Sequence, residues 1–335
     1  MILGILLPRS FAISERMYLV MLIIMAWVNV VSSFQHRHRI QIQTQHSFLS
    51  SAGPSGGPPP SSPLVESIIN NAFKVLYAAD SRSLIDSSKN LRVLWTRALL
   101  NTWGEIDDDI AQTLLPQRTK FIVTNPSFAS LLVPIKDKFS WITKRTKYID
   151  GVLENFLREH PPNTETTNVV VIGAGYDTRS LRYGRKEVQF YEVDLPDIVQ
   201  RKSLLFNSDF VSSLPLDLNS LENSPSIIEL LKSGTTFDES KPTLFVFEAV
   251  LFYLSPESVA NLMTSIMNTN NNNNTYVITD SLMGMKIFPG PSSNEETVAK
   301  WFAGYGKKMI SHDKIWGGAV HLTCAVDDEK SPTQK

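Results

Sequence analysis

The chain carries a glycine turn that is followed, about twenty residues later, by a carboxylate. Gly173 and Gly175 come directly after the apolar run 169–172, and Asp194 ends the next apolar run. Glycines after a buried strand let the chain turn tightly and let backbone N–H groups approach a ligand. A carboxylate after the following strand can accept hydrogen bonds from both ribose hydroxyls. The combination predicts a site for an adenosine-containing ligand, and the alternative is a glycine turn beside an unrelated surface acid.

Other classes of site are disfavoured by residues that are missing or replaced. Thr178 stands where the dinucleotide fingerprint has its third glycine, which disfavours a pyrophosphate ligand and a nicotinamide-dependent oxidoreductase. Cys324 is the single cysteine, so neither an intrachain disulfide nor a multi-cysteine zinc site can form. The histidines that follow residue 64 are scattered, and we predict no metal site.

The elements that must position the turn form a regular alternation. Short apolar runs predict strands at 169–172, 188–193, 210–214, 243–247 and 276–279, and helices begin near Pro196, Pro225 and Pro256. Strand–helix alternation predicts a parallel sheet that is covered on both faces. The runs 309–311 and 319–326 leave no room for a crossover helix and should pair as a hairpin.

The predicted fold class is therefore α/β. We expect a Rossmann-like, doubly wound, mostly parallel seven-stranded sheet with a terminal antiparallel hairpin. Helical spacing of apolar residues over 64–79, 91–103 and 140–160 predicts a helical N-terminal region in front of the sheet. A terminal hairpin distinguishes the methyltransferase version of this architecture from a nicotinamide domain, which ends differently.

Longer segments resemble the leucine carboxyl methyltransferase family. They are GAGYDTR at 173–179, YEVDLP at 191–196 with Arg201 and Lys202, and PTLFVFEAVLFYLSPE at 242–257. KRTKYID at 144–150 resembles the helix that precedes the first strand in that family. The resemblance covers residues 91 to 265 and implies a class I fold, methyl transfer and S-adenosyl-L-methionine as cofactor.

The resemblance also implies roles for individual cofactor-binding residues. Arg145 would grip the methionine carboxylate of the cofactor as a bidentate fork, and Gly173 and Gly175 would line the methionine portion. The remaining contacts would be made by Asp194 to the ribose, Asp217 and Leu218 to the adenine, and Glu248 to the ammonium group or sulfonium side. The alternatives are a solvated helix arginine at 145 and a mere helix cap at Asp217.

The sequence says less about the residues that would contact the methyl acceptor than about those that would bind the cofactor. An ionised carboxylate needs no general base, so no catalytic residue is required if a carboxylate is methylated. A hydroxyl acceptor would need a base, for which Tyr176, Asp177, Tyr253 and His312 are the candidates. Arg179 and Tyr253 are the expected substrate contacts, with Arg179 as a cation near an acidic acceptor, or alternatively in a salt bridge to Glu192 or Asp194.

Only about thirty residues separate the fifth strand from the hairpin, whereas the resemblance implies a longer insertion in the phosphatase-modifying members. We therefore expect an O-methyltransferase that acts on the carboxylate of a small molecule or peptide. One alternative is a leucine C-terminal carboxyl methyltransferase that acts on a protein phosphatase. The other is a non-catalytic module that binds the cofactor.

The N-terminus has the composition of a targeting leader. Residues 1–33 contain an apolar stretch and read as a signal peptide or signal anchor, and residues 34–63 lack Asp and Glu and read as a transit-peptide-like linker. Residues 64–328 would form the methyltransferase domain and 329–335 a tail. This order predicts import into a plastid, with a membrane-anchored protein, or a cytoplasmic one if translation starts downstream, as alternatives. The net charge of −1 predicts no nucleic-acid binding, and we expect no stable membrane association once the leader is removed.

Overall fold

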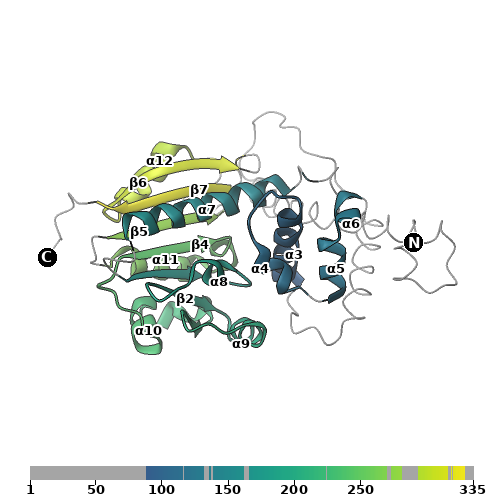
Figure 1. Ribbon diagram of the computed structural model, residues 1–335. Helices are drawn as coiled ribbons and strands as arrows, with labels where there is room; N and C mark the ends of the chain where they lie inside the picture. The colour runs from purple at the N-terminus through teal and green to yellow at the C-terminus, as the bar shows by residue number, and fades with distance from the viewer. Residues whose placement is uncertain are drawn as a thin grey trace. The chain divides into compact units, whose positions relative to one another are not determined.

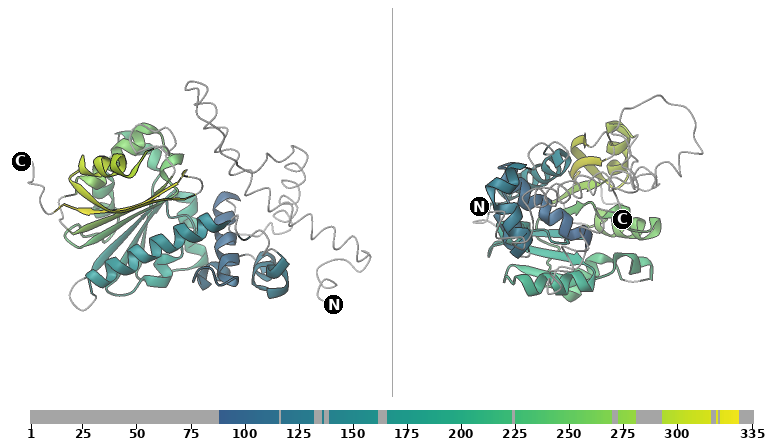
Figure 2. Two further views of the ribbon diagram at one scale, coloured as in Figure 1. Left: turned by 90° about the horizontal axis from the view of Figure 1, so that it is seen from above. Right: turned by 90° about the vertical axis from the view of Figure 1, so that its right-hand side faces the viewer.

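The computed structural model describes residues 88–115, 117–131, 136, 139–161, 166–223, 225–269, 273–280, 293–315, 318 and 320–328 (Figures 1 and 2). Chain contacts define two units, Met1–Ser83 with Ser130–Lys138, and Leu84–Ala129 with Phe139–Lys335. The structure described below is that of the second unit, apart from the last two residues of α6, which the first unit includes. The predicted leader at 1–33, the linker at 34–63, the expected helix at 64–79 and the tail at 329–335 lie outside the described residues.

One sheet of seven strands organises this unit, in the order β3-β2-β1-β4-β5-β7-β6 (Figure 1). The strands are β1 (Thr167–Ile172), β2 (Val188–Asp194), β3 (Val211–Pro215), β4 (Thr243–Glu248), β5 (Asn274–Asp280), β6 (Lys307–Ile315) and β7 (Val320–Asp327). β1 to β5 are parallel, and β7 runs antiparallel to both β5 and β6. The predicted α/β fold with its terminal hairpin is confirmed. The strand order reverses between β1 and β4, which is where ligands bind in open α/β sheets.

The described helices follow the expected alternation. They are α3 (Ser88–Thr102), α4 (Asp109–Thr113), α5 (Gln117–Thr124), α6 (Pro126–Leu131), α7 (Ser140–Glu159), α8 (Arg179–Tyr183), α9 (Pro196–Leu205), α10 (Ile227–Gly234), α11 (Pro256–Met267) and α12 (Glu295–Ala303). Pro196 and Pro256 stand in the first helical turn as predicted. α10 begins at Ile227, two residues after Pro225, because the Ser226 side chain and Glu229 form a capping box there.

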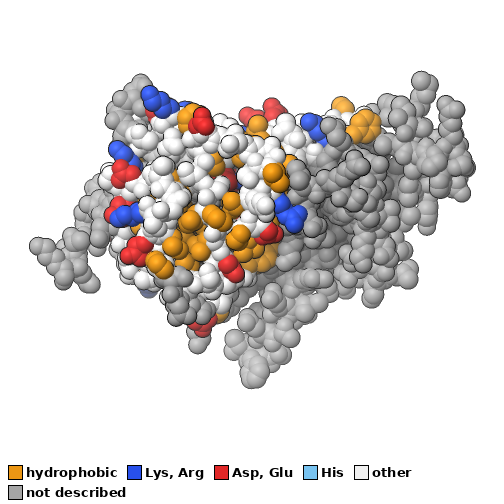
Figure 3. All heavy atoms as spheres, turned by 90° about the horizontal axis from the view of Figure 1, so that it is seen from below, with side chains coloured by type: hydrophobic (Ala, Val, Ile, Leu, Met, Phe, Trp, Pro, Cys, Tyr) orange, Lys and Arg blue, Asp and Glu red, His pale blue; other side chains and the backbone are white. Residues whose placement is uncertain are grey.

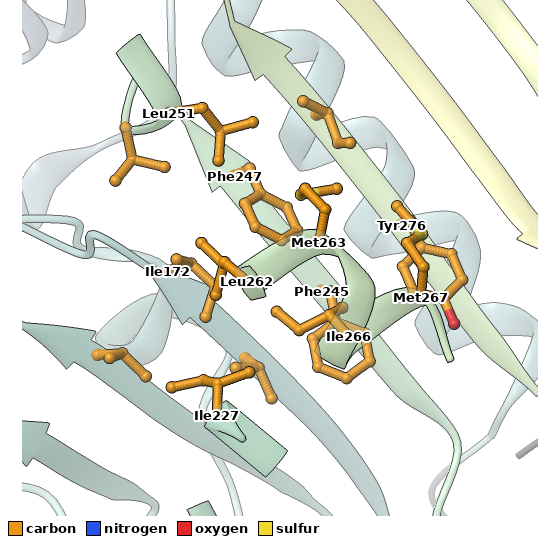
Figure 4. Close-up of a cluster of buried hydrophobic side chains, with 14 of the residues drawn as sticks. Ile172, Ile227, Phe245, Phe247, Leu251, Leu262, Met263, Ile266, Met267 and Tyr276 are labelled. Carbon is orange, nitrogen blue, oxygen red and sulfur yellow. The ribbon is translucent and has the colours of Figure 1, made fainter. Parts of the chain in front are cut away.

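Both faces of the sheet carry an apolar core, because alternate strand residues point to opposite sides. One core joins the sheet to α10, α11 and α12 and includes Phe245, Phe247 and Tyr276 (Figure 4). The other joins it to α7 through Ile149, Leu153 and Phe156. The carboxyl ends of the parallel strands are thereby held in fixed register at one edge of the sheet.

Hydrophobic side chains also gather in the middle of the face that Figure 3 shows from below, with charged groups toward its rim. Among the described helices, none combines the length and the apolar character that crossing a bilayer requires.

Candidate functional site

The glycine turn adopts a conformation that side chains disfavour. Gly173 has φ of 67° and Gly175 has φ of 50°, both in the left-handed region. The Gly173 N–H donates to the Val193 carbonyl of β2 at 2.8 Å, which fixes the turn against the neighbouring strand. A Cβ atom at Gly173 would lie 2.3 Å from Val250 Cγ2, so the turn after β4 packs directly on this glycine. Both its backbone angle and its contact with Val250 require glycine at this position.

Asp194, at the end of β2, is bonded to the same turn. Its Oδ2 accepts the Gly175 N–H at 2.6 Å, and its Oδ1 accepts the Leu195 N–H at 2.7 Å. Burial raises the pKa of Asp194, and these two N–H groups oppose that shift. An ionised carboxylate has about four lone-pair sites, so each oxygen can still accept one hydroxyl. The residue therefore fits the two hydroxyls of a ribose.

Arg145 projects from α7 toward the end of β4. Its Nε donates to Glu248 Oε1 at 2.8 Å, and its guanidinium carbon lies 5.1 Å from the centre of the Trp141 ring. Arg145 is 4% exposed, so it is not a solvated helix arginine. Among the described residues its one ion pair uses Nε, which leaves both terminal nitrogens to form a fork. Arg145 therefore fits a ligand carboxylate.

Arg179 is fully buried and bonded to three carboxylates. Its Nη1 lies 2.6 Å from both Asp177 Oδ2 and Glu248 Oε2, and its Nε lies 2.6 Å from Asp150 Oδ1. Burial opposes the charge, yet Asp177, Glu248 and Asp150 raise the pKa of Arg179 well above its ordinary value.

This position differs from the expected substrate contact, because no surface of Arg179 is exposed to an acceptor. The expected salt bridge to Glu192 or Asp194 is also replaced. Glu192 instead pairs with Lys202 at 2.7 Å and accepts from Ser180.

The same network reaches the N-terminal helices. Arg97 of α3 lies 2.8 Å from Asp108 Oδ2 and donates to Thr178 Oγ1, and Thr178 donates to Asp108 Oδ1 at 2.7 Å. Arg182 of α8 pairs with Asp150 of α7 at 3.0 Å. The network thus joins four arginines (Arg97, Arg145, Arg179, Arg182) to four carboxylates (Asp108, Asp150, Asp177, Glu248).

Arg97, Asp108 and Arg182 were not among the site residues predicted from the sequence. Arg97 is flanked by apolar residues in α3. Because a charged side chain is almost never fully buried without a partner, this setting could have indicated that Arg97 has a buried carboxylate partner.

The adenine and acceptor candidates lie in different surroundings. Asp217 is exposed and its Oδ1 accepts the Asn219 N–H, so it caps the short 3-10 helix Leu218–Asn223. Leu218 is buried in the core that faces α10 and α11. Tyr253 is 47% exposed, and burial and the charge of Asp280 raise its pKa while Arg145 lowers it. The adenine roles of Asp217 and Leu218 and the substrate role of Tyr253 stay predictions.

The model of one protein family, leucine carboxyl methyltransferase, matches residues 90–267, more than half of the chain. The chain belongs to this family. The predicted recognition is therefore confirmed, as is S-adenosyl-L-methionine as the family's cofactor. The match begins in α3 and ends with α11, and it includes the arginine–carboxylate network.

Curated relatives share shorter stretches with the chain. A protein of Mycolicibacterium vanbaalenii, named as an S-adenosyl-L-methionine-dependent methyltransferase, is 26% identical over 37% of this chain and 40% of its own. The tRNA wybutosine-synthesizing protein 4 of Homo sapiens is 29% identical over 41% of this chain and 24% of its own. The chain therefore spans less than half the length of these relatives.

Solved structures similar to the chain include two methyltransferases. Magnesium protoporphyrin IX methyltransferase of Synechocystis PCC 6803, with bound SAM, has 11% identity and a TM-score of 0.37 over 56% of this chain and 84% of its own. A TehB-like SAM-dependent methyltransferase of Corynebacterium glutamicum has 10% identity and a TM-score of 0.37 over 61% of this chain and 100% of its own.

Proposed function

We propose that the chain is an S-adenosyl-L-methionine-dependent methyltransferase. The observation that carries the proposal is the convergence of three groups at the carboxyl edge of the sheet in a chain of this family. They are the glycine turn, the Asp194 carboxylate bonded to it, and the Arg145 guanidinium, whose ion pair with a described residue uses Nε. The site lies where the strand order reverses.

Each group has a separate binding task. Asp194 would accept the ribose hydroxyls, and Arg145 would hold the methionine carboxylate through its terminal nitrogens. Glu248 keeps one further lone pair on each oxygen beside its bonds to Arg145 and Arg179, and it would accept from the ammonium group. The bound cofactor supplies an activated methyl group on a sulfonium, and the protein aligns it and excludes water.

We further propose a carboxylate of a small molecule or peptide as a methyl acceptor. Membership of a carboxyl methyltransferase family supports the carboxylate, and the short segment between β5 and α12 supports a small partner. Such an acceptor is ionised at neutral pH and needs no base. Methylation of a phosphatase C-terminus and cofactor binding without catalysis are the competing outcomes of the test.

Calorimetry with S-adenosylhomocysteine tests the cofactor site. Asp194→Ala should weaken binding by about 1–3 kcal/mol, or about 5- to 150-fold, because the ribose hydroxyls lose a buried acceptor. Asp238→Ala is the matched control, since Asp238 is an exposed acid that precedes β4 at the opposite edge of the sheet. Equal affinities of the Asp194→Ala variant and the unaltered chain would refute the ribose assignment.

Import into a plastid is the proposed destination. Its support is the apolar run within residues 1–33 and the acid-free segment 34–63. A fusion of residues 1–63 to a fluorescent protein should enter the plastid of an alga with secondary plastids. Fluorescence confined to the endoplasmic reticulum or the plasma membrane would reject this destination.

A further inference from the structure

The turn that follows β4 contains a strained residue. Ala249 comes directly after Glu248, and its φ of 54° lies in the left-handed region that favours glycine. No other non-glycine residue in the described part of the chain has a positive φ. An L-residue in this conformation has its Cβ crowded against the following carbonyl oxygen, so the surrounding structure must hold the turn in this shape.

Asp280, the last residue of the neighbouring strand β5, is bonded to this turn. Its Oδ2 accepts the N–H groups of Val250 and Leu251, each at 2.8 Å. The Ala249 N–H donates to the Thr279 carbonyl at 3.0 Å, so three consecutive N–H groups of the turn are bonded to the end of β5. Asp280 is 1% exposed. Because hydrogen bonds to a buried carboxylate are among the stronger ones in proteins, these contacts can offset the strain at Ala249.

The turn also touches the proposed cofactor site at two points. Glu248, directly before it, accepts from Arg145 Nε at 2.8 Å. Val250, within it, packs so closely on Gly173 that a Cβ there would lie 2.3 Å from Val250 Cγ2. The backbone conformation between these two contacts therefore sets where the Glu248 carboxylate lies relative to the glycine turn.

The core fixes the far end of the same turn. Leu251 is fully buried and belongs to the apolar core that includes Phe247 of β4 (Figure 4). With Phe247 and Leu251 both held in the core, the three residues between them must complete the turn within a fixed span. Such a turn is preorganised, and a preorganised site loses less conformational freedom when a ligand binds.

We propose that Asp280 is a positioning residue for the cofactor. Its carboxylate holds Ala249 in the left-handed conformation, which places Glu248 to accept from the ammonium group of the methionine portion. The inference rests on the proposed function, in which Glu248 has that task. Asp280 acts through the backbone of the turn, and Glu248 is the group that meets the cofactor.

An acid at the opposite edge of the sheet provides a matched control. Asp327, at the end of β7, also accepts a backbone N–H, that of Asn274 at 2.9 Å, and it pairs with Lys307 at 2.6 Å. Its side chain is 7% exposed. Asn274 begins β5, whereas the glycine turn follows the end of β1, so Asp327 supports the fold at the edge away from the cofactor site.

Calorimetry with S-adenosylhomocysteine on the full chain tests the inference, under conditions in which urea titrations show each variant to be folded. Asp280→Ala should weaken binding by about 5- to 30-fold, which corresponds to the cost of about 1–2 kcal/mol for a left-handed residue, because the turn relaxes without its acceptor. Asp280→Asn keeps one acceptor oxygen and should retain most of the affinity. Asp327→Ala should lower the urea midpoint and leave the affinity unchanged.

Ala249→Gly separates positioning of the turn from support of the fold. Glycine adopts a positive φ at no steric cost, so the turn keeps its shape with less help from Asp280. Adding Ala249→Gly to Asp280→Ala should therefore restore most of the lost affinity, a coupling that a merely structural role does not produce. If Asp280→Ala does not fold, Asp280→Asn takes its place, and Ala249→Gly should recover its smaller loss.

Two results overturn the inference. One is an affinity of Asp280→Ala equal to that of the unaltered chain, and the other is a loss of affinity that Ala249→Gly leaves in full. Either result leaves the proposed function standing as long as the unaltered chain binds S-adenosylhomocysteine. Absence of binding by the unaltered chain overturns both.

Discussion

Gly173→Ala should damage both stability and cofactor binding, for two reasons that can be separated. A side chain at φ of 67° costs about 1–2 kcal/mol. The new Cβ would also lie 2.3 Å from Val250 Cγ2 and 2.8 Å from Val250 Cβ, and forcing such a buried contact apart costs about 1–3 kcal/mol. The free energy of unfolding should therefore fall by about 2–5 kcal/mol.

Gly104→Ala is the matched control for backbone strain. Gly104 has φ of 70°, and nothing lies within 4 Å of a Cβ placed there, so this variant should cost only about 1–2 kcal/mol. The difference between the two variants measures the overlap with Val250. Urea unfolding with linear extrapolation gives the stabilities, and calorimetry with S-adenosylhomocysteine gives the affinities.

Combining each alanine with Val250→Ala completes the test. Removing the Val250 methyl groups should recover part of the loss in Gly173→Ala and none in Gly104→Ala. A steric overlap with Val250 is refuted if Gly173→Ala costs no more than Gly104→Ala, or if its cost adds to that of Val250→Ala without coupling.

The arginine–carboxylate network supports two further predictions. Glu248→Gln removes the negative charge that pairs with both Arg145 and Arg179. Removing one partner of a buried ion pair leaves the other charge uncompensated, so the free energy of unfolding in urea titrations should fall by about 3–5 kcal/mol. A loss below about 1 kcal/mol would contradict this. Burial alone would raise the pKa values of Asp177 and Asp150, but the charge of Arg179 holds both below their ordinary value. The two carboxylates therefore stabilise the folded state fully above their unfolded pKa of about 3.9, and this contribution is lost as pH falls through their lower folded pKa values. Unfolding free energies measured from pH 7 to pH 2 should decline below about pH 4, and a constant value there would refute this role.

Much of the sheet follows from the apolar pattern, because parallel strands that are buried on both faces read as continuous apolar runs. β1 and β4 are fully buried over most of their length and were predicted within two residues. β6 extends over Lys307–Ile315, well beyond the predicted 309–311. It is an edge strand whose exposed positions carry polar residues such as Lys308 and Ser311, so its apolar run is short.

The site residues also fall into those that the sequence predicts and those that it does not. Gly173, Gly175 and Asp194 lie in local motifs, and the structure brings them together. The pairing of Arg97 with Thr178 joins residues 81 positions apart, and no local pattern specifies such a contact. His312 and His321 look scattered in the sequence, but the terminal hairpin places them in one hydrogen bond. Contacts made by topology rather than by spacing are the part that sequence reasoning could not supply.

The network also dictates an order of assembly during synthesis on the ribosome. Arg97 and Thr178 are separated by 81 residues, and Arg145 and Glu248 by 103. At ~5–20 residues per second, the N-terminal helices wait about 4–20 s for these partners.

A nascent chain that ends before β4 carries Arg97, Arg145, Arg179 and Arg182 against only Asp108, Asp150 and Asp177, an excess of one positive charge in this cluster. Arg97, Arg179 and Arg182 already have carboxylate partners in this chain, whereas the ion pair of Arg145 is made with Glu248. Arg145 therefore stays hydrated until Glu248 emerges, because an uncompensated charge resists burial. Closure of the unit around the proposed cofactor site is thereby delayed until β4 has been made.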